Sequence, residues 1–114
     1  MLISFHKAKI QKEFSDEKLL IRRWGSEQAK LIKRRLVELG AAENLDDLRK
    51  LPQIRAHELI RDRAGQISLD VKYPYRLIIV PDYEKKDIPR NKDGGLDWQK
   101  ITKVKVLEIA DTHD

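Results

Sequence analysis

The sequence predicts an α+β domain, in which a short N-terminal strand and two helices pack on an antiparallel sheet of about four strands. Apolar residues in the first half recur at spacings of three and four, the period of a helix with one buried face. After Pro52 the pattern changes to alternation and short apolar runs, which are typical of strands. The 114 residues contain no repeat and no low-complexity tract, so residues 1–114 are expected to form one domain.

Two helices are predicted, over residues 9–24 and residues 26–39, after a short strand at residues 2–5. Ser26 is placed to cap the start of the second helix. Gly40 is placed to end it, because glycine adopts the left-handed conformation at little cost. The apolar residues of this helix share one face: Ala29, Ile32, Leu36 and Leu39.

The rest of the chain is expected to form the sheet. Asn44 and Asp47 predict a short capped helical turn before it. Residues 81–99, rich in Pro, Gly and charge, predict a long loop that is either mobile or functional. The alternation of the last strand changes phase after Val106, which indicates a bulge or burial on both faces. The predicted strands cover residues 54–60, 66–71, 76–80 and 101–109, with a tight turn at residues 62–65 and the 76–80 strand in the centre.

Positive charge is concentrated in the first half of the chain, although the formal net charge is only +5. Residues 1–63 carry 15 Lys and Arg against 10 Asp and Glu, whereas residues 64–114 carry 9 of each. Lys30, Lys33 and Arg34 lie together on one face of the second helix. Such a surface suits a polyanion such as nucleic acid. A solvated lysine-rich surface that binds no ligand explains the charge alone equally well.

Composition excludes several kinds of site. The chain has no cysteine, so it has no disulfide framework and no thiolate metal site. Its three histidines lack the spacing of metal ligands, and no glycine-rich phosphate loop follows a predicted strand. We therefore expect neither a metal nor another cofactor. No apolar run approaches the roughly 18 residues of a membrane span, and the N-terminus lacks the pattern of a signal peptide, so a cytoplasmic protein is expected.

Four residues near strand ends are candidates for catalysis: His57, Arg76, Asp111 and His113. Cleaving RNA without a metal requires a base for the 2′-hydroxyl proton, an acid for the departing 5′-oxygen and positive charge at the phosphate. Two histidines and one arginine supply these three roles at neutral pH. Asp111 receives a supporting role, in which it orients a ring or pairs with Arg76.

Each of these candidates also has a purely structural interpretation. Taken alone, His57 is better explained as a satisfied structural or interfacial histidine. Arg76 is equally explained as half of a surface ion pair with one of the 19 acidic residues, and His113 as a terminal residue without a role. The spacing of these residues alone does not decide between chemistry and structure.

Short segments along nearly the whole chain form an ordered set. In the first half they are Trp24-Gly25, the helix over residues 29–39, Ala41-Ala42 and residues 45–48. In the second half they are Arg55-Ala-His57-Glu-Leu59, residues 62–66, Tyr75-Arg76-Leu77, residues 101–104 and residues 108–114. With this set, the chain resembles HigB-type members of the RelE/ParE toxin superfamily.

This resemblance implies the RelE-like fold and ribosome-dependent cleavage of mRNA in the decoding site. It also implies a helix-turn-helix antitoxin, similar to HigA, as a partner. His57 matches the histidine of the family's His-x-Leu segment, and Arg76 matches the arginine that opens the central strand. Asp111 and His113 match the first and last residues of a C-terminal Asp-Tyr-His.

The chain departs from the family pattern at two of these positions. Thr112 stands where many members have tyrosine, and Ile60 stands where some members have a catalytic lysine. Arg61 and Arg63 are the nearby residues that could replace the charge of that lysine. The residues assigned to RNA or ribosome binding are Lys30, Lys33, Arg34, Arg61 and Arg63.

Two other classes of function stay open at this point. ParE-like toxins of the same superfamily poison DNA gyrase and do not cut RNA. A non-catalytic module would only dock its basic helix on an antitoxin or on nucleic acid. His57 and His113 favour the nuclease, because a docking surface has no need of an acid–base pair.

Overall fold

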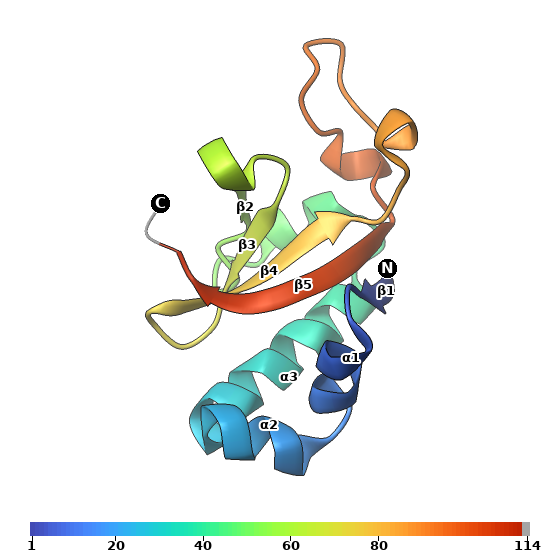
Figure 1. The fold of residues 1–114 in the computed structure, drawn as a ribbon. Helices are drawn as coiled ribbons and strands as arrows, with labels where there is room; N and C mark the ends of the chain where they lie inside the picture. The colour runs from blue at the N-terminus through green and yellow to red at the C-terminus, as the bar shows by residue number, and fades with distance from the viewer. Residues whose placement is uncertain (113–114) are drawn as a thin grey trace.

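The helices lie together on one side of the sheet (Figure 1). The computed structural model describes residues 1–112, and this part of the chain has the predicted α+β fold. Its strands are β1 (Leu2–Phe5), β2 (His57–Glu58), β3 (Ile67–Asp70), β4 (Tyr75–Pro81) and β5 (Lys103–Asp111). Its helices are α1 (Ala8–Phe14), α2 (Glu17–Trp24) and α3 (Ser26–Ala41). Within residues 1–112, no helix combines the length and apolar character needed to cross a membrane.

The sheet has the strand order β1-β5-β4-β3-β2. Strands β2 to β5 form an antiparallel meander, with β4 in the centre as predicted. Strand β1 lies beyond β5 and runs parallel to it, with Leu2 opposite Lys103. The predicted antiparallel sheet of about four strands is therefore present as β2 to β5, but the sheet of the described residues is larger and mixed, because the N-terminal strand joins it as a fifth, parallel strand. Nearly the whole domain separates β1 from β5 in sequence, so no hairpin turn dictates their relative direction.

Strand β2 is much shorter than the strand predicted over residues 54–60. Only His57 and Glu58 pair with β3. Arg55 has a φ of +48°, a left-handed conformation that an extended strand excludes. The predicted tight turn over residues 62–65 is a short 3₁₀ helix, Arg61–Arg63, followed by Gly65 at a φ of +88°.

The bulge predicted in the last strand is confirmed. Ile78 pairs with Glu108 and Ile79 pairs with Val106, so Leu107 is the extra residue of β5. The bulge changes the phase of the alternation, so that Glu108 lies opposite Ile78 and Ala110 lies opposite Arg76.

The structure has three α-helices in residues 1–112 where the sequence pattern predicted two. The helical segment over residues 9–24 is divided by Ser15 and Asp16. The Asp16 carboxylate accepts hydrogen bonds from the backbone N–H groups of Lys18 (3.0 Å) and Leu19 (3.4 Å). These are N–H groups that a helix start leaves without a partner, so Asp16 begins a new helix instead of continuing the first.

Both predicted ends of α3 are also corrected. Gly25, with a φ of +86°, occupies the capping position, and Ser26 is the first helical residue. Gly40 remains inside the helix, which ends at Ala41. The amino group of Met1 donates to the carbonyl oxygens of Leu39 and Gly40, each at 3.2 Å. This positive charge satisfies the last carbonyls of α3, a task that a left-handed glycine performs in other helices.

The core lies between α3 and the sheet, and it confirms the predicted apolar face of the helix except that Leu36 is only partly buried. Part of the 81–99 loop also belongs to this core, because Leu96 and Trp98 are buried. The guanidinium of Arg49 stacks 3.7 Å from the centre of the Trp98 ring. The principal buried residues of helix and sheet are Ala29, Ile32, Leu39, Ile67, Leu69, Leu77, Ile79, Val104 and Val106.

A reciprocal cap begins the 3₁₀ helix Leu45–Lys50, as the sequence predicts. The Asn44 side chain accepts from the Asp47 N–H at 3.1 Å, and the Asp47 carboxylate accepts from the Glu43 N–H at 3.0 Å. Asn44→Ala should lower the free energy of unfolding, measured with urea, by about 1 kcal/mol. Lys72→Ala, which removes only an exposed ion pair with Glu27, is the matched control. Equal midpoints for the two variants would contradict the capping role.

The same cap has a pH dependence that a titration of stability measures. The Glu43 N–H, and then the Lys50 ammonium, hold the pKa of the Asp47 carboxyl below its usual value. A lowered folded-state pKa means that this contribution is present at neutral pH and is lost as the pH falls through that pKa. The stability difference between wild type and Asp47→Asn should therefore shrink in acid, and a constant difference would contradict this origin.

Candidate functional site

The candidate site lies on the face of the sheet that points away from the helices, here called the outer face. Leu77 and Ile79 of β4 point into the core, so Arg76 and Ile78 point the opposite way. The same alternation in β3 places Ser68 and Asp70 on the outer face. The residues of the outer face used below are Ser68, Asp70, Arg76, Ile78, Glu108 and, opposite Ser68, His57.

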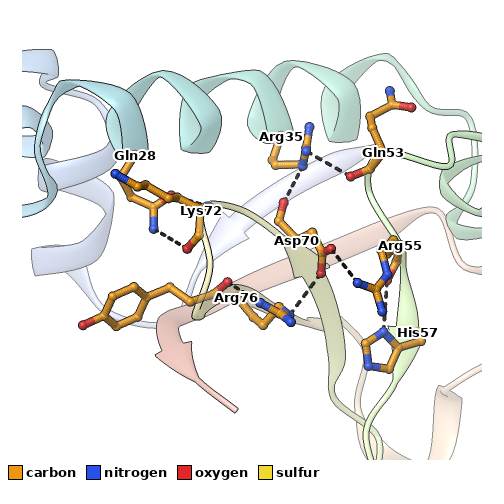
Figure 2. A network of polar contacts seen from close by, with 9 residues as sticks. Gln28, Arg35, Gln53, Arg55, His57, Asp70, Lys72 and Arg76 are labelled. Atoms are coloured by element: carbon orange, nitrogen blue, oxygen red, sulfur yellow. Dashed lines mark hydrogen bonds and ion pairs between the residues drawn. The ribbon is translucent and has the colours of Figure 1, made fainter. Parts of the chain in front are cut away.

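Asp70 is the centre of the charged contacts on this face (Figure 2). It pairs in register with Arg76 across the sheet, and its Oδ1 lies 3.0 Å from Nε of Arg76. Its Oδ2 lies 3.4 Å from Nη1 of Arg55. Arg76 also donates from Nη1 to the carbonyl oxygen of Tyr75 at 2.9 Å. One carboxylate thus contacts two guanidinium groups, and the trio has a net charge of +1.

His57 joins this group through the backbone of Arg55. Its Nδ1 lies 3.0 Å from the carbonyl oxygen of Arg55, and the imidazole ring is exposed. A carbonyl oxygen only accepts hydrogen bonds, so Nδ1 carries the proton of this bond. In the neutral ring Nε2 then holds the lone pair. The left-handed backbone of Arg55 is part of this arrangement, because Arg55 supplies both the carbonyl and one guanidinium.

Arg35, on α3, connects that helix to the backbone of the site from the helix side of the sheet. It is 5% exposed and donates from Nε to the carbonyl oxygen of Asp70 at 2.6 Å and from Nη2 to that of Gln53 at 3.2 Å. Its Nη1 pairs with Glu38 at 2.7 Å. Sequence reasoning missed this residue. The spacing could have identified it as buried, because Arg35 lies three residues after Ile32 and four before Leu39, in the buried stripe of α3.

The structure brings His57 and Arg76 to one face, and β5 ends beside them. Asp111, the last residue of β5, lies opposite Tyr75 in register, while Ala110 lies opposite Arg76. Alternation therefore places Asp111 with Tyr75 on the helix side of the sheet, so the structure does not bring it to the outer face beside Arg76. His113, predicted as the second acid–base group, lies outside the described residues. Ser68 Oγ, next to His57 in register, is buried and has no hydrogen-bond partner among residues 1–112.

The residues predicted to bind RNA divide into two groups. Lys30, Lys33 and Arg34 are exposed on α3, on the side of that helix opposite its buried face and away from the outer face. The second group consists of Arg61 and Arg63, on the 3₁₀ helix that follows β2.

In each of these groups, one residue is already paired with an acidic side chain of the same chain. Lys33 pairs with Glu17 at 3.0 Å. Arg63 reaches across the outer face, where its Nη1 contacts Gln66 at 2.8 Å and Glu108 at 3.3 Å. Of the two groups, only the second has a residue whose side chain contacts the outer face, namely Arg63 at Glu108.

Over residues 1–112, no group of three or more His, Cys, Asp or Glu side chains has the arrangement of a metal site. Comparison with protein-family models, with characterised proteins and with solved structures gives no match for this chain. The outer face offers two chemical capabilities: guanidinium groups that attract an anion, and an exposed imidazole that takes up a proton.

Proposed function

We propose that this protein is a metal-independent endoribonuclease with the RelE-like fold, a toxin of a type II toxin–antitoxin system that cleaves translated mRNA in the ribosome. The observation that carries the proposal is the presence of His57 and Arg76 on one face of the sheet, linked through Arg55 and Asp70. The resemblance of the sequence to HigB-type toxins, over nearly the whole chain, supports the same conclusion.

The spacing of the strands suits a phosphodiester between the two residues. His57 and Arg76 lie on strands separated by β3, and their register positions differ by two residues. Ideal strand spacing then places their Cα atoms roughly 12 Å apart. The Arg76 side chain reaches over β3 to Asp70 and is 17% exposed, so a phosphate would bind at the solvent-facing edge of its guanidinium.

In the proposed reaction the 2′-oxygen of the ribose attacks the adjacent phosphorus atom, and the bond from phosphorus to the 5′-oxygen breaks. His57 takes the 2′-hydroxyl proton at Nε2, the nitrogen that its bond to Arg55 leaves as the acceptor. Arg76 stabilises the negative charge that develops on the phosphate. His113 donates the proton to the departing 5′-oxygen, and Asp111 supports it. The products are a 2′,3′-cyclic phosphate and a 5′-hydroxyl.

The partners proposed with this activity are the ribosome, mRNA and a HigA-like helix-turn-helix antitoxin, all in the cytoplasm. Expression of the chain alone should stop growth, and 5′ ends of cellular mRNA should map inside translated codons. Intact mRNA and normal growth at high expression would remove the nuclease proposal. Growth arrest with double-strand DNA breaks would instead support the ParE-like alternative.

Lys30, Lys33 and Arg34 are proposed to bind ribosomal or messenger RNA without taking part in the reaction. Changing all three to Ala should weaken ribosome binding and reduce its dependence on salt, because each phosphate contact releases counterions. The rate for bound mRNA should stay near that of wild type. The measurement is ribosome co-sedimentation over a salt series, and an unchanged salt slope would identify this face as solvated surface.

A further inference from the structure

We propose that Asp70 is a positioning residue that holds Arg55 and Arg76 as a two-arginine clamp, and that Arg55 is a second ligand of the scissile phosphate. This inference rests on the proposed ribonuclease function and deepens it, since it adds two residues to the site. Neither residue was a catalytic candidate from the sequence.

The contacts of Asp70 are those of a residue that positions other side chains. Its two carboxylate oxygens contact different guanidinium groups, Oδ1 that of Arg76 and Oδ2 that of Arg55. A guanidinium has five N–H donors, and the contacts with Asp70 and Tyr75 engage two nitrogens of Arg76. The ion pair therefore orients the group and leaves it able to bind a phosphate.

The backbone of Asp70 is itself held on two sides. Its N–H donates to the carbonyl oxygen of Ile54 at 2.8 Å, and its carbonyl oxygen accepts from Nε of the buried Arg35 at 2.6 Å. The Asp70 side chain is about one-fifth exposed, whereas that of Arg55 is 68% exposed. A well-anchored carboxylate thus holds an exposed guanidinium in place, which is how a site is preorganised for binding.

Arg55 is tied to the site at two points. Its carbonyl oxygen accepts from His57 and its guanidinium contacts Asp70, although its φ of +48° is unfavourable for a residue with a side chain. Unfavourable backbone of this kind persists where surrounding contacts over-determine it, and it concentrates at functional sites. Arg55 and Arg76 therefore both lie against the Asp70 carboxylate, and the His57 ring is held beside them by the backbone of Arg55.

The role of Asp70 is testable through Asp70→Asn, which keeps the size of the side chain and removes its charge. In a ribosome cleavage assay kcat should fall by about 10²-fold, the cost of misplacing a catalytic group by an ångström, while KM changes little. Asp70→Glu should recover part of the loss. Asp82→Asn is the matched control, because the Asp82 carboxylate also contacts a cation, Lys105, but at the other end of the sheet. There it also accepts a hydrogen bond from the Ser4 hydroxyl. A kcat of Asp70→Asn equal to that of Asp82→Asn would overturn the positioning role.

A second measurement tests the clamp independently of cleavage. Inorganic phosphate is titrated into the full ¹⁵N-labelled chain, and the Nε–H signals of Arg55 and Arg76 are followed by NMR. Both signals should shift with one dissociation constant in wild type, and Arg55→Ala should weaken that constant by several-fold. A shift of Arg76 alone, or of neither arginine, would overturn the role of Arg55. Joint shifts in a wild-type chain that cuts no mRNA would refute the ribonuclease function and leave the phosphate clamp standing.

Discussion

His57→Ala should lower the rate of mRNA cleavage by about 10²- to 10⁴-fold, the usual cost of losing a proton-transfer group. The reason is the hydrogen bond from Nδ1 to Arg55, which leaves Nε2 to accept the 2′-hydroxyl proton. Alanine removes this acceptor and leaves Arg76 and Asp70 in place. The rate is measured with purified ribosomes on a defined mRNA, under single-turnover conditions.

His57 is exposed, so the variant should unfold at the wild-type temperature. His6→Ala is the matched control, because His6 is an exposed histidine that follows β1. A His57→Ala variant that cuts as fast as His6→Ala would identify His57 as a structural histidine.

Arg35→Ala should lower the free energy of unfolding by about 3–5 kcal/mol, the range found when one partner of a buried ion pair is removed. Arg35 is buried and contacts Glu38 and the carbonyl oxygens of Gln53 and Asp70. Its loss removes the ion-pair partner of the Glu38 carboxylate, which keeps a hydrogen bond from Gln53, and the Arg35 donors of two carbonyl oxygens. Urea unfolding followed by circular dichroism measures the difference.

Arg34→Ala is the control for this experiment, since Arg34 is the exposed neighbour of Arg35 on the same helix. Its effect should stay within about 0.5 kcal/mol, as is usual for surface substitutions. Because Arg35 holds Asp70, Arg35→Ala should also slow cleavage at temperatures at which it remains folded. Equal unfolding midpoints for the two variants would contradict the anchoring role of Arg35.

The sequence predicts the elements whose pattern is local. The alternation in β3 and the apolar run in β4 place Leu69 and Leu77 in the core correctly, and the change of phase after Val106 indicates the bulge at Leu107. The side chains that alternate with these core residues then face outward, so Arg76 on the outer face follows from the same pattern.

The remaining features depend on contacts between distant parts of the chain. The parallel pairing of β1 with β5 joins residues about 100 positions apart, which no local period indicates. Asp70 reads as an ordinary polar position of β3, because its partners Arg35 and Arg55 come from α3 and the segment before β2. The left-handed Arg55 also interrupts a segment whose composition favours a strand.

The chemistry of the cut tests the central claim most directly. An mRNA with one 2′-deoxynucleotide at the mapped cleavage position is compared with the all-ribose mRNA on purified ribosomes, and the product ends are analysed by mass spectrometry. We predict cleavage of the ribose substrate to a 2′,3′-cyclic phosphate and a 5′-hydroxyl, and no cleavage at the deoxy position, because His57 then has no 2′-hydroxyl to deprotonate. Cleavage of the deoxy substrate, or products with 5′-phosphate ends, would contradict the proposed mechanism.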